Sequence, residues 1–172
     1  MNETEYSMEK IEQADLDRLA SLAERNRKTF FARRGRWGIY QDRIVAVALC
    51  QGAALHFVDG KSGVKDFDVW TFYAKHPEGP FPSRVVNHED FGESKFGRNP
   101  NIPASYRGRC VDLIGRAIDC NVGADPVQSL RMYLSQRRTR SATQLARKAV
   151  VLIEPKNLRG TVIWPLSSET TA

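Results

Sequence analysis

The chain lacks the features that mark membrane, disulfide-rich and repeat proteins. None of its apolar runs approaches the ~20 residues that a membrane-spanning helix needs, so no membrane partner is expected. Internal repeats and low-complexity tracts are absent. The acidic N-terminus has neither the basic nor the apolar region of a signal peptide, and a cytoplasmic location is therefore expected.

Cysteine is also scarce, and the three cysteines are odd in number and without metal-ligand spacing. Cys50 and Cys110 lie in apolar segments and are interpreted as small core residues rather than nucleophiles. The length of 172 residues suits one domain, and no linker divides the chain. We expect a single domain over residues 1–172, with a core at about 36–120 and a helical C-terminal part at about 121–172.

The net charge of +6 is unevenly distributed along the chain. Residues 1–24 contain seven acids and two bases, whereas residues 25–36 contain six bases and no acid. A second acid-free stretch contains Arg131, Arg137, Arg138, Arg140, Arg147 and Lys148. Such clusters attract the phosphates of a nucleotide or a nucleic acid. A solvated helix face is the alternative, because few aromatic side chains are interleaved with these bases.

Periodicity predicts an N-terminal helix followed by strands. Asp15 is a candidate helix cap and Gly35 a candidate end, and one apolar stripe between them holds Leu16, Leu19, Ala20, Ala23, Arg27 and Phe30. Residues 44–49 resemble a buried strand, residues 52–54 open a short helix, and further strands are expected at 65–72 and 109–114. This order predicts an α+β fold.

The C-terminal part is expected to flank a small mixed sheet with helices. Asp125 and Pro126 are typical of a helix start, since the acid caps and the proline needs no N–H there. Ser141 is predicted to begin a second helix that continues to Ile153 and ends at Pro155. Residues 161–165 are expected to add a short edge strand. Between the second and third strands, residues 75–106 hold five of the eight prolines and are predicted to be a long loop, either for binding or simply ordered on the surface.

The most informative pattern joins a glycine turn to two carboxylates. In a strand over 65–72, Asp66 and Asp68 project from the same side, where their repulsion calls for a cation such as Mg²⁺. Gly52 lies at the start of the short helix, where small residues let a ligand approach the backbone and free N–H groups favour an anion. A phosphate and a metal ion would then lie side by side, as phosphoryl or nucleotidyl transfer requires.

This pattern resembles the signature of the nucleotidyltransferase superfamily, which includes DNA polymerase beta and the small bacterial minimal nucleotidyltransferases. The match comprises Gly52, Ala53, Asp66, Asp68 and Asp112. The resemblance implies that Asp66 and Asp68 bind one or two Mg²⁺ ions and that Asp112, on a neighbouring strand, is the third catalytic and metal-binding acid. Two positions depart from the family pattern, because Ala53 stands where serine is common and Gln51 where an apolar residue is common.

The resemblance implies a magnesium-dependent transferase that moves an NMP group from an NTP to an unknown acceptor hydroxyl on a small molecule, a protein or RNA. Nucleotide-binding roles fall to Gly52 and Ala53 through their N–H groups, and to the side chains of Lys61, Ser62, Lys65 and Arg116. Two alternatives stay open: an inactive protein of this fold that binds a nucleotide or a protein partner, and a basic nucleic-acid-binding module. A homodimer is also left open.

Overall fold

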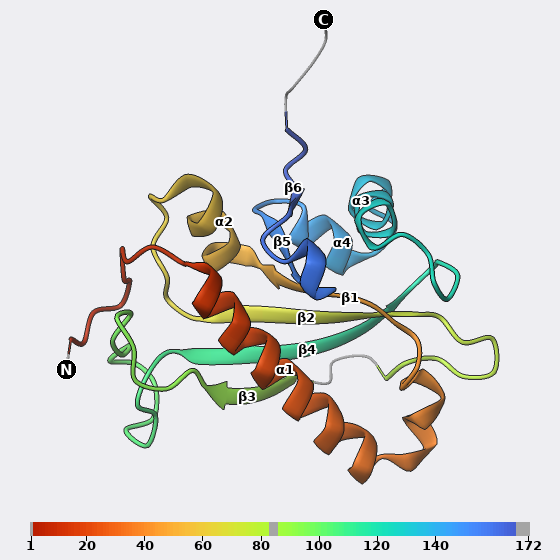
Figure 1. Ribbon diagram of the computed structural model, residues 1–172, viewed down its shortest axis with the longest axis horizontal. Coiled ribbons are helices and arrows are strands. Elements are labelled where there is room, and N and C mark those ends of the chain that lie inside the picture. Colours follow the sequence, from red (N-terminus) through yellow and green to blue (C-terminus); the bar gives the residue numbers. More distant parts are fainter. Residues whose placement is uncertain (1, 83–85, 168–172) are drawn as a thin grey trace, which may run out of the picture.

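The computed structural model describes residues 2–82 and 86–167 and shows an α+β fold around one mixed sheet (Figure 1). The sheet order is β3-β4-β2-β1-β5-β6. Neighbouring strands are antiparallel except β2 and β4, which pair in parallel. The elements in chain order are α1 (Gln13–Arg33), the 3₁₀ helix η1 (Gly35–Tyr40), β1 (Ile44–Cys50), α2 (Gln51–Asp59), β2 (Phe67–Ala74), β3 (Val86–Asp90), β4 (Cys110–Ile118), α3 (Pro126–Gln136), α4 (Arg140–Leu145), β5 (Val150–Glu154), the 3₁₀ helix η2 (Lys156–Leu158) and β6 (Val162–Trp164).

Helices cover both faces of the sheet, which explains why the central strands are nearly continuous apolar runs. Helices α1 and α2 lie on one face (Figure 1). Their apolar side chains pack on alternate residues of β1, β2 and β4, such as Leu49 and Phe67. On the other face, α3 and α4 cover a second core through Leu130 and Leu145. Within the described residues, no helix has both the length and the apolar character needed to cross a membrane.

The start of α1 differs in detail from the prediction. Asp15 is not the cap itself. It lies three residues after the cap residue Glu12, and its Oδ2 accepts a hydrogen bond from the Glu12 N–H at 2.7 Å, which forms a reciprocal capping box. The predicted apolar stripe is confirmed, since Leu16, Leu19, Ala20, Ala23 and Phe30 are buried. The helix ends at Arg33, and Gly35 opens η1 rather than closing α1.

The predicted helix from Ser141 to Ile153 is wrong in its second half. Helix α4 ends at Leu145, and β5 then runs as an interior strand between β1 and β6. The β-branched and apolar run Val150-Val151-Leu152-Ile153 is fully buried because its side chains alternate between the two cores. A short continuous apolar run fits a helix or a buried strand by periodicity alone, and here pairing with β1 decides it.

The segment 75–106 was predicted to be a long loop, but part of it forms a strand. It contributes β3, the edge strand that pairs with β4. The carboxylate of Asp90 accepts hydrogen bonds from the N–H groups of Gly92, Arg107 and Gly108, so the end of β3 is tied to the approach to β4. Phe91 and Phe96 are buried against Phe67. Residues 83–85 of this segment lie outside the described part.

Burial of β5 predicts a large cost for truncating its central side chain. Leu152 is completely buried, so Leu152→Ala should lower the free energy of unfolding by about 2–5 kcal/mol. Val122→Ala is the control, because Val122 is 55% exposed and its truncation should change stability by less than about 0.5 kcal/mol. Urea unfolding measures both values. Equal effects of the two substitutions would contradict an interior strand at 150–154.

Candidate active site

Two of the predicted acids, Asp68 and Asp112, lie in one row of paired residues that crosses the sheet. Asp68 on β2 is the register partner of Asp112 on β4, and Asp112 is in turn the partner of His88 on β3. On the other side, Asp68 pairs with Cys50 at the end of β1. Adjacent strands are about 4.8 Å apart, so Asp68 and Asp112 carry their carboxylates side by side on one face. This face is the one that α3 and α4 cover elsewhere.

Asp66 precedes β2 by one residue, and a buried arginine holds the backbone there. The Arg109 side chain is completely buried and donates hydrogen bonds to the carbonyl oxygens of Phe96, Glu5 and Lys65. The Nη1 atom of Arg109 lies 3.3 Å from the carbonyl oxygen of Lys65, which is the residue before Asp66. Arg109 thereby joins the N-terminal segment, the 96–109 loop and the start of β2, which fixes where Asp66 stands.

A pocket of about 560 Å³ lies where β1 turns into α2, and it brings most of the predicted residues together. Asp66 and Asp68 line it together with residues of the first turn of the helix. Gly52, Ala53, Ser62 and Lys65, which the resemblance assigns to nucleotide binding, also line it. The pocket is completed by residues that the sequence did not assign to this site: Tyr6, Gln51, Leu55, Gly63, Gln144 and Lys148.

The backbone at the start of α2 is open toward this pocket. Gln51 takes the left-handed conformation, with φ at 60°, so the chain turns sharply from β1 into the helix. A side-chain carbon added at Gly52 would meet only Lys148 Nζ, at 3.9 Å. The first N–H groups of a helix have no partner within the helix. Glycine at this position therefore leaves room for an anion to reach them.

Ala53 occupies the position where the nucleotidyltransferase pattern commonly has serine. Ala53 is 1% exposed and packs in the core, and it has no hydroxyl with which to contact a ligand. Ser62 lines the pocket, and its Oγ donates a hydrogen bond to Asp59 Oδ2 at 2.7 Å. Lys65 also lines the pocket and pairs with Glu5 at 3.3 Å. Lys61 is not among the lining residues.

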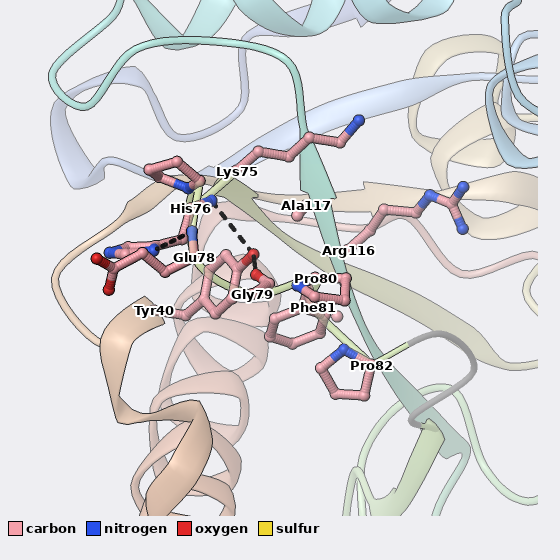
Figure 2. A pocket seen from close by; sticks show the side chains of 12 residues that line it. Tyr40, Lys75, His76, Glu78, Gly79, Pro80, Phe81, Pro82, Arg116 and Ala117 are labelled. Carbon is pink, nitrogen blue, oxygen red and sulfur yellow. Dashed lines mark hydrogen bonds between the residues drawn. The ribbon is translucent and has the colours of Figure 1, made fainter.

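Arg116 lies apart from the other predicted residues. It follows Asp112 by four residues on β4, roughly 13 Å along a strand. There it lines a second hollow, of about 450 Å³, with Tyr40, Lys75 and Phe81. Figure 2 shows the Arg116 side chain leaving this hollow, with its guanidinium directed away from Tyr40 and Phe81. The structure thus does not gather Arg116 with Gly52.

Burial and mutual repulsion disfavour the ionised forms of Asp66 and Asp68. Burial raises the pKa of Asp68 from its usual 3.8 to about 7, and the neighbouring carboxylates of Asp66 and Asp112 add to the shift. Burial, and then the charge of Asp112, also raises the pKa of Asp66. Lys148 acts in the opposite direction on both groups. A cation bound among these oxygens would relieve the imbalance, which fits the donor set that Mg²⁺ prefers.

Asp112 is held toward the sheet edge. Its Oδ1 lies 2.6 Å from His88 Nδ1 and accepts a hydrogen bond from the Cys110 thiol at 3.4 Å. In the described part of the chain, His88, Cys110 and Asp112 form the one trio of metal-ligating side chains whose ligand atoms all lie within 4.8 Å of one another. Asp66, Asp68 and Asp112 are neighbours, but their carboxylate oxygens do not all lie within that distance of one another.

Comparison with protein-family models, curated proteins and solved structures gives no match. The resemblance to nucleotidyltransferases therefore rests on the residues of this chain alone. The structure places four of the five signature residues, namely Gly52, Ala53, Asp66 and Asp68, around one pocket, with the fifth, Asp112, beside Asp68.

The raised pKa of Asp68 predicts a specific pH dependence of stability in metal-free protein. The folded pKa of about 7 lies above the usual 3.8, so folding favours the protonated form of Asp68. The resulting stabilisation is fully present below about pH 4 and is lost as the pH rises through 7. Asp68→Asn should therefore stabilise the protein by up to about 4 kcal/mol at about pH 8 and by little at about pH 4. Urea unfolding at several pH values measures this difference.

The matched control is Asp42→Asn, at an exposed acid in the turn before β1. Because Asp42 is exposed, this substitution should change the free energy of unfolding by less than about 0.5 kcal/mol at both ends of the pH range. If Asp68→Asn also gave a difference independent of pH, the Asp68 carboxylate would not be a buried, uncompensated charge.

Proposed function

We propose that the protein is a metal-dependent nucleotidyltransferase that moves a nucleoside monophosphate from an NTP to an acceptor hydroxyl. One observation carries the proposal: Asp66 and Asp68 line the same 560 Å³ pocket as Gly52 at the first turn of α2. Small-molecule sites commonly have volumes of about 300–1,000 Å³. An anion site and a pair of carboxylates in one pocket are the two requirements for holding a nucleoside triphosphate with its metal ion.

The residues divide the work by their chemistry. The N–H groups at Gly52 and Ala53 would hold the outer phosphates, and Lys148, whose Nζ lies near Gly52, would neutralise part of their charge. Asp66 and Asp68 would hold one or two Mg²⁺ ions, with Asp112 as a further ligand. Bound there, the metal would offset the negative charge of the triphosphate and of the departing pyrophosphate.

Transfer forms one bond and breaks one bond. The oxygen of the acceptor hydroxyl bonds to the α-phosphorus while the bridging bond between the α-phosphorus and the β-phosphate oxygen breaks, and pyrophosphate leaves with that electron pair. The hydroxyl proton passes to a carboxylate. Asp112 is the acid next to Asp68 in the register, so it is the group of this chain assigned either to accept this proton or to share the metal.

A second candidate function, nucleic-acid binding, is favoured by one observation. Arg140, Thr143, Gln144 and Arg147 line a hollow of about 350 Å³, and Gln144 also lines the aspartate pocket. A basic surface therefore borders the proposed nucleotide site. Steep loss of oligonucleotide binding with rising salt would support this function, and it would also favour RNA as the acceptor.

The proposed reaction predicts release of pyrophosphate from an NTP in the presence of Mg²⁺. Pooled acceptors of each class, namely small alcohols, protein and RNA, are supplied with each of the common NTPs. Asp68→Asn should lower the rate at least about a hundredfold, because a carboxylate is lost from the metal site. Asp42→Asn should retain full activity.

The outcomes separate the alternatives. Mg²⁺-dependent NTP binding that is lost in Asp68→Asn, without pyrophosphate release from any acceptor, would favour the inactive nucleotide-binding alternative. Absence of Mg²⁺-dependent NTP binding by the wild-type protein would contradict both the enzyme and the inactive form.

The position of Lys148 predicts a defect in nucleotide affinity. Lys148→Met keeps the aliphatic stem and removes the ammonium, so the Kd for Mg²⁺-NTP should rise about tenfold, equivalent to about 1.4 kcal/mol. Lys28→Met is the control, because Lys28 is an exposed lysine of α1 that pairs with Glu24. Fluorescence titration with a labelled NTP measures both values. Equal affinity of Lys148→Met and wild type would place the phosphates elsewhere.

A further inference from the structure

The edge of the sheet carries a second group of potential metal ligands, which shares Asp112 with the site proposed above for Mg²⁺. His88 on edge strand β3 and Cys110 on β4 both approach the same oxygen of Asp112, at 2.6 Å and 3.4 Å. Cys110 Sγ and His88 Nδ1 are 4.0 Å apart. Cys110 and Asp112 are two residues apart on one face of β4, and antiparallel pairing of β3 with β4 brings His88 to them.

We propose that His88, Cys110 and Asp112 form a binding site for a borderline-soft divalent cation, with Zn²⁺ as the best match. A thiolate, an imidazole and a carboxylate are the ligands that zinc uses, whereas Mg²⁺ prefers oxygen alone. The proposal does not depend on nucleotide chemistry, since it requires only the metal and these three side chains.

The distances fit a tetrahedral ion with small adjustments. With Zn–S near 2.3 Å and Zn–N or Zn–O near 2.0–2.1 Å, neighbouring ligand atoms are about 3.3–3.6 Å apart. The observed S···O distance of 3.4 Å already agrees with this range. The S···N distance of 4.0 Å must shorten slightly, and the N···O distance of 2.6 Å must lengthen, as a hydrogen bond does when a metal ion replaces its proton.

The surroundings allow both access and charge balance. The His88 side chain is 58% exposed, so an ion can enter from solvent at the sheet edge, and a water molecule can take the fourth position. A coordinating thiol gives up its proton to become a thiolate when Zn²⁺ binds. The complex of Zn²⁺ with one thiolate and one carboxylate is neutral.

Co²⁺ serves as the spectroscopic probe, added to the full-length, reduced, metal-free protein. We expect one Co²⁺ per chain with a thiolate-to-cobalt absorption band, displacement of that band by stoichiometric Zn²⁺, and no displacement by a large excess of Mg²⁺. In weak buffer, Zn²⁺ binding should release about one proton per ion at neutral pH. Competition with a coloured chelator gives the Zn²⁺ affinity.

Variants test the ligands one at a time. Cys110→Ser should abolish the thiolate band, and His88→Ala should weaken Zn²⁺ binding at least about a hundredfold, more than loss of an outer-shell partner does. Cys120→Ser and His76→Ala are matched controls, a cysteine and a histidine outside the trio, and should bind Zn²⁺ like the wild type. Circular dichroism confirms that each variant is folded. Co²⁺ binding without the thiolate band, or equal Zn²⁺ affinity of the wild type and Cys110→Ser, would overturn the proposal.

Discussion

Parallel pairing of β2 with β4 is the constraint on which the site depends. It sets Asp68 directly beside Asp112, and antiparallel pairing of β3 then adds His88 to the same row. In a sheet, a slip of one residue would send every side chain of β2 to the opposite face. The apolar residues Phe67 and Val69, which belong to the core under α1 and α2, prevent such a slip. Hydrophobic burial on one face therefore fixes the positions of the acids on the other.

The electrostatic consequence is a concentration of buried negative charge that the protein compensates only in part. Burial and repulsion disfavour ionised Asp68, and Lys148 offsets a fraction of that cost. Lys148 occupies this place because it immediately precedes Ala149 and β5, whose first residue Val150 is the partner of Cys50. The same geometry distributes ligands of two kinds across one face: oxygen ligands beside the α2 turn, and a mixed sulfur, nitrogen and oxygen set at the sheet edge.

Local patterns in the sequence predicted the parts of the fold that depend on local chemistry. The apolar stripe of α1, the Asp125 cap of α3 and the turn from β1 into α2 follow from residues close together in the chain. The errors arose where long-range pairing decides. Residues 150–153 have no periodicity that distinguishes a helix from a buried strand. Because a helix was predicted there, the position of Lys148 beside the pocket could not be predicted. His88 lies in the segment 75–106, which the sequence predicts to be a long loop, whereas its partners Cys110 and Asp112 lie more than twenty residues away, across the β3–β4 pairing.

The central claim is that a hard divalent cation binds among Asp66 and Asp68 beside the α2 turn when an NTP is present. Mn²⁺ shares the oxygen preference of Mg²⁺ and broadens the NMR signals of nuclei near it. Trace Mn²⁺ added with a non-hydrolysable NTP should selectively broaden the backbone amide signals of residues 51–53, 66–68 and 112. Broadening centred on other exposed acids, or identical with and without the nucleotide, would contradict the claim.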